Sequence, residues 1–440
     1  MTGEPSGADN GRVPDWIGSL PAQWEAKSVR RLTLDHRQGY YATDEYTDEG
    51  IKLLRITDLR DGGLIEHSQS PFVQDVAEIN PFILQQNDFV FARTGGAGTF
   101  GLVREAPNDK VAYASYLIRF RFSEEANFLR YAFLSPGFQS ELQRNIHGGV
   151  NQNVHAEDIK AQYVPIPPKS EQRSIAAFLD RETGKIDALV EEQERLIGLL
   201  KEKRQAAVSH AVTKGLDPDA KMKPSGVEWL GDVPEYWEVQ RLGVLFREIA
   251  EPGSDDLPIL SVSIHHGVSD TELGDEDLDR KVIRSDDRSK YKRVRPDDLV
   301  YNMMRAWQGG FGSVTADGMV SPAYVVARPK TDVSTRFIEA LLRTPQAVEE
   351  MRRRSRGVTD FRLRLYWEEF KDISVAVPPV QEQRQIVDTV SFLEIRTAEL
   401  VSSSQRLVEL LQERRAALIS AAVTGKIDVQ ETAQADVEVA

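Results

Sequence analysis

Side chains suited to recognising another polar molecule gather in four short segments of this chain, two in each half. In each half, one segment contains an arginine close to a glycine pair, and the other is dense in amides or in arginines. Amide side chains pair with the edge of adenine, and arginine pairs bidentately with guanine or phosphate. We therefore expect nucleic-acid contacts from Arg93, Thr94, Asn151, Gln152, Asn153, Arg305, Trp307, Gln308, Arg354, Arg356, Arg362 and Arg364. The alternatives are a polar turn for the amide run and a solvated basic helix end for the arginines.

Patterns typical of enzymes are incomplete. The glycine-rich run 95–101 is not followed by Gly-Lys-Ser/Thr, so it is not a phosphate-binding P-loop. Asn80-Pro81-Phe82-Ile83 is similar to the motif of amino-methyltransferases but lacks its second proline. The histidines have no metal-ligand spacing. We expect no catalytic residue, no metal and no cofactor in this chain.

One nuclease-like pattern needs separate treatment. Pro14-Asp15 followed by Glu25 and Lys27 matches the Pro-Asp…Glu-x-Lys arrangement. However, Glu25 belongs to a segment that recurs later, and the second copy has Gln240 in place of Lys27. A structural strand start is the better interpretation. A nuclease would require that the purified chain cut DNA with a divalent metal and that Lys27→Ala abolish cutting.

Composition limits the possible partners. The 440 residues carry a net charge of −14, which argues against a chain that neutralises many phosphates by itself. Residues 13–164 hold 15 basic against 20 acidic side chains, and residues 227–374 hold 22 against 27. There is no cysteine and no apolar run of membrane-spanning length. We expect a cytoplasmic protein.

The elements that position these segments are two copies of one long helix. Residues 164–217 and 375–428 align without a gap at a constant offset of 211 positions, with about two residues in five identical. The helices are predicted at 169–214 and 380–425, with Ser170 as an N-cap and Gly215 and Gly425 as C-terminal stops. Gly184 could kink the first helix.

Apolar residues recur with heptad spacing along both helices. The seam is expected to contain Ile186, Leu189, Leu196, Leu200, Leu400, Leu407, Leu411 and Leu418. Two such helices most simply pair with each other as an antiparallel coiled coil that has a globular domain at each end. The alternative is two unrelated amphipathic helices, each docked on its own local core.

A second repeat divides the chain into two similar halves. Residues 16–25 match residues 229–238, and we call these two copies the tryptophan motifs. The expected organisation is a disordered N-terminus (1–12), a first domain (13–168), the first helix, a linker (215–226), a second domain (227–379), the second helix and a C-terminal tail (426–440), of which residues 430–440 are expected to be mobile. Both domains are expected to be mixed α+β.

Periodicity and turn signals predict similar elements in both domains. In the first domain, strands are expected at 51–56, 88–92 and 116–122, and helices at 127–134 and 138–145. In the second, strands are expected at 258–264, 298–302 and 323–328, and helices at 335–342 and 346–354.

The arrangement resembles the specificity subunits of type I restriction–modification systems over nearly the whole chain. The resemblance rests on the Pro-Pro-x-x-Glu-Gln-Arg-x-Ile helix starts at Pro167 and Pro378, the helix endings at 211–213 and 422–428, and the tryptophan motifs. It implies two target recognition domains, each reading one half of a split asymmetric DNA sequence, with the paired helices setting the gap between the half-sites. It also implies a non-catalytic chain whose helices dock two methyltransferase subunits.

In that family the methyltransferase subunits use S-adenosylmethionine to methylate adenine, and restriction subunits that need ATP and Mg²⁺ join some complexes. Acidity is then tolerable, because the larger partners hold the phosphates, and the isolated chain should bind DNA weakly. Two alternatives remain open. A similar subunit could serve a methyltransferase without restriction subunits, or the chain could be a scaffold whose helices and domains bind proteins.

Overall fold

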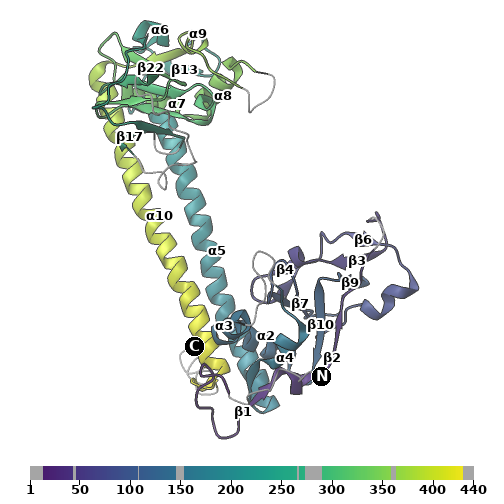
Figure 1. The fold of residues 1–440 in the computed structure, drawn as a ribbon. Coiled ribbons are helices and arrows are strands. Elements are labelled where there is room, and N and C mark those ends of the chain that lie inside the picture. The colour runs from purple at the N-terminus through teal and green to yellow at the C-terminus, as the bar shows by residue number, and fades with distance from the viewer. Residues whose placement is uncertain are drawn as a thin grey trace. The chain divides into compact units, whose positions relative to one another are not determined.

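The computed structural model describes residues 13–42, 46–107, 109–144, 153–264, 267–272, 290–357 and 363–429. The chain divides into two compact units, 1–193 with 406–440 and 194–405. Each unit contains one globular domain, here called domain 1 or domain 2, together with one half of each long helix (Figure 1). The expectations for residues 1–12 and for the tail from residue 430 fall outside the described residues.

The long helices are α5 (Lys169–Lys214) and α10 (Val380–Val423), and both are continuous. Each begins directly after a proline pair that cannot continue a helix. The prediction of Ser170 as an N-cap is wrong, because Ser170 already lies inside the first turn. No break occurs at Gly184. Gly215 and Gly425 follow the helix ends with φ of +80° and +69°, as C-terminal stops require.

Within each unit the start of one long helix packs beside the end of the other, so the pairing is antiparallel (Figure 1). In the first unit, Ile175 and Leu179 of α5 share a core with Ile419 of α10, and Asp187 pairs with Arg415 at 2.8 Å. In the second unit, Val212 of α5 shares a core with Ile386 and Val390 of α10. The two helices therefore form an antiparallel pair and are not independent.

Domain 1 is a mixed α+β domain built on a four-stranded antiparallel sheet of order β2-β10-β7-β8 (Figure 1). Its strands are β1 (Glu25–Ser28), β2 (Thr33–Gln38), β3 (Ile51–Leu54), β4 (Leu59–Arg60), β5 (Leu64–Ile65), β6 (Phe72–Val73), β7 (Phe89–Ala92), β8 (Phe100–Leu102), β9 (Val111–Tyr113), β10 (Leu117–Phe122) and β11 (Tyr163–Ile166). Its helices are α1 (Val29–Leu32), α2 (Ala126–Leu134), α3 (Pro136–Arg144) and α4 (Ala156–Ala161), with 3₁₀ turns η1 (Ile56–Asp58) and η2 (Ala77–Phe82). A cluster of phenylalanines joins the sheet to α2 and α3.

Domain 2 repeats this topology in a sheet of order β15-β22-β19-β20. Its strands are β12 (Met222–Pro224), β13 (Asp232–Pro234), β14 (Glu238–Arg241), β15 (Phe246–Ile249), β16 (Leu260–Ser263), β17 (Gly267–Glu272), β18 (Lys292–Val294), β19 (Leu299–Asn302), β20 (Phe311–Ser313), β21 (Gly318–Val320), β22 (Tyr324–Pro329) and β23 (Ser374–Val377). Its helices are α6 (Leu242–Leu245), α7 (Thr335–Leu342), α8 (Pro345–Arg354) and α9 (Trp367–Phe370), with the 3₁₀ turn η4 (Ala306–Gln308). The strands and helices expected from periodicity are confirmed in both domains, with shifts of at most two residues at their ends.

The likeness of the two sheets extends to one unusual turn. Asn87 and Asp297 precede β7 and β19, and both adopt positive φ, at 69° and 70°. Asn and Asp are the non-glycine residues that tolerate this conformation best. The buried carboxylates that follow them, Asp88 and Asp298, each accept hydrogen bonds from an arginine on the neighbouring strand. Two domains with different sequences therefore share the same turn and the same carboxylate–arginine pair before the corresponding strand.

The segments next to the C-terminal ends of the long helices contribute to the structure of the units. Strand β12 lies inside the expected linker 215–226 and pairs with β13. Ile427 and Val429, in the expected tail, pack against the core of domain 1. Among the described residues, no helix is long and apolar enough to cross a membrane.

Candidate nucleic-acid interface

In domain 1, the two predicted segments lie against each other at one end of the sheet. The backbone N–H of Val154 donates to the carbonyl oxygen of Arg93 at 2.8 Å, and Thr94 and Asn153 form an antiparallel bridge. Chain segments about sixty residues apart thus present Arg93, Thr94 and Asn153 together. Asn151 and Gln152 lie outside the described residues.

The same arrangement occurs at the corresponding place in domain 2. The N–H of Leu365 donates to the carbonyl oxygen of Met303 at 2.9 Å, which brings the arginine-rich segment beside the turn that follows β19. Arg356 and Arg364 exchange two backbone hydrogen bonds of 2.9 Å. The turn holds Arg305 and leads into η4, which contains Trp307 and Gln308.

Trp307 is held in a fixed orientation. Its indole N–H donates to the carbonyl oxygen of Met304 at 3.1 Å, and the guanidinium of Arg352 lies 5.9 Å from its ring centroid. Arg352 is absent from the candidate residues chosen from sequence, although it belongs to the same arginine run. The two residues are far apart in the sequence, so no local pattern indicated this contact.

Ion pairs divide the predicted arginines of domain 2 into two groups. Arg354 pairs with Glu350, and Arg356 pairs with Glu369. Arg305 and Arg364 have no ion pair with any described residue, and Arg364 is exposed. Arg362 lies outside the described part of the chain. The charges of Arg305 and Arg364 are therefore the more available for a phosphate or a base edge.

In each domain an ion pair joins the same two strands at the end opposite the candidate surface. Arg328 donates to both oxygens of Asp298 at 2.8 and 2.9 Å, and this hydrogen bonding raises the pKa of its guanidinium. Arg121 makes the corresponding pair with Asp88, at 2.6 and 3.1 Å. Bidentate pairs of this kind fix the geometry of neighbouring strands.

The helix residues chosen from the heptad pattern occupy two environments. Ile186 is buried, and Leu200, Leu411 and Leu418 are half-buried. Leu189, Leu196, Leu400 and Leu407 are 39–51 % exposed, so a large part of each residue stays uncovered in the helix pair. Two paired helices bury only a narrow stripe, and leucines beside that stripe stay outside. These four residues stay candidates for contact with a partner.

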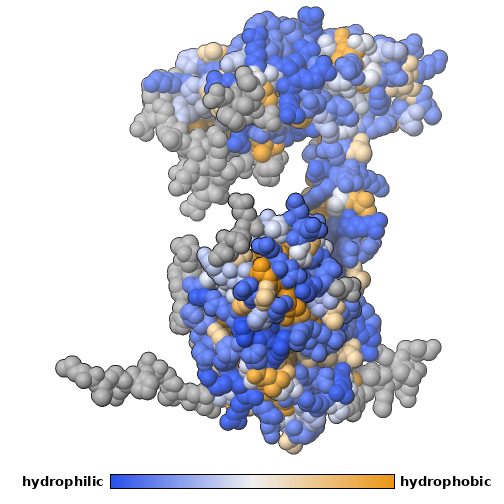
Figure 2. Space-filling model, turned by 90° about the vertical axis from the view of Figure 1, so that its right-hand side faces the viewer, coloured by the Kyte–Doolittle hydropathy of each residue, from blue (hydrophilic) through white to orange (hydrophobic). Residues whose placement is uncertain are grey.

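The exposed apolar residues are not gathered in one large patch on the face shown in Figure 2. Described residues on this face are mostly hydrophilic, with hydrophobic residues in small groups. The −14 net charge of the chain fits this largely polar surface.

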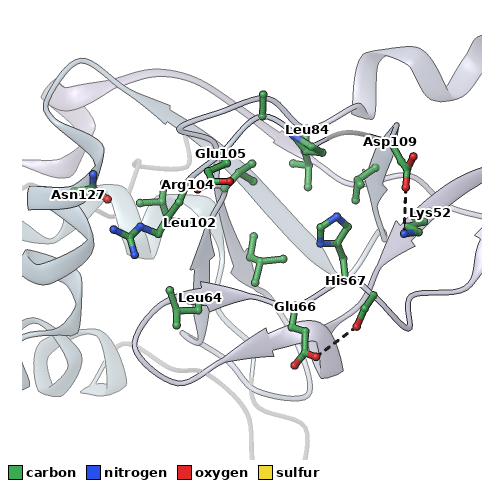
Figure 3. Close-up of a pocket in the computed structure, with 16 residues that line it drawn as sticks. Lys52, Leu64, Glu66, His67, Leu84, Leu102, Arg104, Glu105, Asp109 and Asn127 are labelled. Atoms are coloured by element: carbon green, nitrogen blue, oxygen red, sulfur yellow. Dashed lines mark hydrogen bonds and ion pairs between the residues drawn. The ribbon is translucent and has the colours of Figure 1, made fainter. Parts of the chain in front are cut away.

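Domain 1 contains a pocket of about 830 Å³ between β3, β5, β8 and β9 (Figure 3). Leu84, Leu102 and Val111 are among its apolar lining residues, and His67 points into it (Figure 3). Its charged groups are largely paired, Lys52 with Asp109 at 3.3 Å and Arg104 with Asp180 at 3.2 Å. The Ser68 hydroxyl in the lining donates to Glu66 at 3.4 Å.

Two residues of the nuclease-like pattern lie on a paired strand. Glu25 and Lys27 lie on β1, which pairs with β11, and their side chains form an ion pair of 3.2 Å. Among the described residues, no three histidine or acidic side chains are placed to hold a metal ion.

Comparison with known proteins gives a family match for part of the chain. Residues 36–196 match the model of the type I restriction modification DNA specificity domain. The chain is similar to the specificity subunits of type I restriction–modification systems. Its relatives include the type I restriction enzyme EcoBI specificity subunit of Escherichia coli, 26 % identical over 59 % of this chain and 57 % of the relative. A putative type I restriction enzyme MjaX specificity subunit of Methanocaldococcus jannaschii is 24 % identical over 52 % of this chain and 53 % of the relative.

The matched segments thus span little more than half the length of these two relatives. Solved structures of the family share the fold over nearly the whole chain. A chain from a structure of the type I restriction–modification system has a TM-score of 0.67 at 16 % identity, covering 93 % of this chain and all of that chain. The HsdS subunit of Thermoanaerobacter tengcongensis has a TM-score of 0.52 at 17 % identity, covering 93 % and 98 %. Specificity subunits are generally non-catalytic, and the comparisons do not support a scaffold without DNA.

Proposed function

We propose that this chain directs a type I restriction–modification complex to its DNA target. Domain 1 reads one half of a bipartite asymmetric sequence, and domain 2 reads the other half. The long helices set the unread gap between the half-sites and dock two methyltransferase subunits. The observation that carries this proposal is that the two domains share one fold but present different side chains at the same end of the sheet. Both domains have the same sheet and the same joint to the helices, but one end presents Arg93, Thr94 and Asn153, and the other is rich in arginine.

The chemistry belongs to the partners in this proposal. The methyltransferase subunits use S-adenosylmethionine to methylate adenine at N6, and restriction subunits, where present, hydrolyse ATP with Mg²⁺ and cut DNA. The chain itself supplies base contacts and positions the partners. Since each domain has five more acidic than basic residues, the partners must hold most of the phosphates. The isolated chain should therefore bind DNA weakly.

Single-molecule methylation mapping tests the proposal directly. DNA from cells that carry this chain and its neighbouring methyltransferase gene is compared with DNA from cells that lack only this chain. N6-methyladenine in one split asymmetric motif, lost on deletion, is the expected result. Unchanged methylation would contradict it. Replacing residues 13–164 with the domain of another family member should change one half-site only, which separates the roles of the two domains.

A further inference from the structure

A second set of side chains converges on the Arg93–Thr94 turn from distant parts of domain 1. The N–H of Arg93 donates to the carbonyl oxygen of Tyr116 at 2.9 Å. The glycines that follow Arg93 lie on Ile56, since a Cβ at Gly95 would be 3.3 Å from its side chain. Arg55 immediately precedes Ile56.

Arg55, Arg93 and Tyr116 are called the tyrosine–arginine cluster below. Arg93 follows β7 and Tyr116 precedes β10, and the backbone hydrogen bond between them joins the ends of these paired strands. The cluster lies at the end of the sheet that also holds the Thr94–Asn153 bridge.

Both arginines of this cluster have unused hydrogen-bond donors. The Nε atoms of Arg55 and Arg93 are shielded from solvent and have no acceptor among the described residues. Arg93 has no ion pair in the described part of the chain, and the terminal nitrogen of Arg55 lies 3.6 Å from Asp58 and 3.5 Å from the carbonyl oxygen of Gln69. By contrast, Arg60 of the same domain pairs with Glu66 at 2.9 Å. A shielded donor without an acceptor suits a ligand that brings acceptor atoms.

The cluster is accessible, and domain 2 has a similar place. The Arg55 side chain is about one-third exposed. In domain 2, the carbonyl oxygen of Ile264, just after β16, would lie 3.3 Å from a Cβ at Gly309. The segment after β3 and the segment after β16 therefore pack on the glycine turns that follow β7 and β19. Both domains use this end of the sheet for the residues suited to base contacts.

We propose that Arg55 and Arg93 bind acceptor atoms of the DNA half-site read by domain 1. This inference rests on the proposed function and adds Arg55 to the reading surface. The acceptors are either O6 and N7 of guanine or phosphate oxygens, both of which arginine binds through paired N–H groups. The two sources predict different behaviour for lysine, which keeps the charge but not the planar fork.

The test uses the full chain in complex with its methyltransferase subunits. Arg55 and Arg93 are each changed to Gln and to Lys, and Arg60→Gln is the matched control. For each complex, the methylated motif is mapped, and DNA affinity is measured over a range of salt concentrations. An arginine that contacts guanine should lose roughly 5- to 150-fold discrimination at one position of half-site 1 in both variants, with half-site 2 unchanged. An arginine that contacts phosphate should tolerate Lys, whereas Gln should weaken binding to all sequences and reduce the salt slope by about one.

The inference is overturned if the double variant Arg55→Gln/Arg93→Gln keeps the motif, the affinity and the salt slope of the Arg60→Gln control. Thermal unfolding of each complex identifies variants that lose structure, and for these the Lys variants decide. Failure of the proposed function looks different, because the unchanged chain would then direct no methylation to a split motif, and this inference would fall with it.

Discussion

The indole N–H of Trp24 donates to the carboxylate of Glu171 at 3.0 Å, and the same bond recurs between Trp237 and Glu382 at 3.3 Å. Each bond fastens a tryptophan motif to the first turn of a long helix. The end of the other long helix closes the joint, since Gly425 lies against Trp24 and Gly215 lies against Trp237. Residues that the two halves of the sequence share therefore form the joint between domain and helices.

Trp24→Phe should destabilise the first unit by about 1–2 kcal/mol, because a hydrogen bond to a charged group is lost while the ring is largely kept. Trp237→Phe should cost less, since its bond is longer and Glu382 also accepts from the hydroxyl of Tyr236 at 3.0 Å. Urea unfolding of both variants measures the difference. A double-mutant cycle with Glu171→Ala, which removes the acceptor, should give a favourable coupling energy, and purely additive effects would contradict the bond.

A buried glutamine fixes each domain to its helix. The side chain of Gln383 donates to the carbonyl oxygen of Pro378 at 2.8 Å and accepts from the N–H of Ser334 at 2.8 Å, and Gln172 makes the corresponding bonds in the first unit. Gln383→Leu leaves a buried carbonyl and an N–H without partners, so it should destabilise the second unit by about 2–3 kcal/mol.

The matched control for that change is Gln385→Leu, two residues further along the same helix, where the side chain is exposed. Its effect on the free energy of unfolding should stay within about 0.5 kcal/mol. Equal losses in the two variants would show that leucine in this helix, and not the broken bonds, is the cause.

How much the sequence predicts depends on whether the signal is local. The internal repeat and the glycines after it were enough to predict both helices, and Gly215 and Gly425 have the positive φ expected of stops. Ser170 failed as an N-cap because the helix begins at Lys169, directly after the proline pair and two residues before the start that an N-cap at Ser170 implies. Leu196 and Leu407 fit the heptad spacing of the seam. Two adjacent stripes of a helix can fit that spacing, and the sequence does not tell which stripe faces the partner helix.

The candidate DNA-contacting residues also show that contacts between residues far apart in the sequence could not be predicted. The pairing of Arg354 with Glu350 can be foreseen from i, i+4 spacing on a helix. The pairing of Arg356 with Glu369 cannot, because tertiary packing brings the two residues together. Arg55 gave no signal in the sequence, since its place beside Arg93 follows from the packing of Ile56 on a glycine turn.

Glycine-to-alanine changes within and just after the long helices should change the free energy of unfolding in opposite directions. A Cβ at Gly425 would lie 2.7 Å from Pro21, whereas at Gly215 the nearest atom, at 3.0 Å, is the end of the flexible Glu382 side chain. Both residues have positive φ, so each change to Ala should cost about 1–2 kcal/mol, and Gly425→Ala should cost more. Gly184 has nothing within 4 Å of its Cβ position, so Gly184→Ala should stabilise by about 0.5–1 kcal/mol. Thermal unfolding of the three variants gives the order, and destabilisation by Gly184→Ala would contradict it.

Acid should weaken domain 1 through Asp35. A hydrogen bond from the nearly buried Arg119 holds the pKa of Asp35 below its ordinary value. A carboxyl whose pKa is lower in the folded state contributes stability that is complete above the unfolded pKa, about 3.9, and is lost as pH falls through the folded pKa. Asp35→Asn should therefore reduce stability at pH 7 and flatten its pH dependence below about pH 4. Urea unfolding between pH 3 and 7 checks both, and an unchanged acid slope in Asp35→Asn would rule out this pair as the cause.

The length of the paired helices should set the gap between the two half-sites. Four residues inserted after Val190, with four inserted at the facing position of α10, add about one turn, or roughly 6 Å, to the pair. That length corresponds to about two base-pair rises, so the methylated motif should keep both half-sites and gain about two base pairs between them. Four residues inserted after Asp219, in an exposed turn outside the helices, form the control and should leave the gap unchanged. Methylation mapping of both insertion variants measures the gap. Half-sites that changed while the gap stayed constant would mean that the helices do not set the distance.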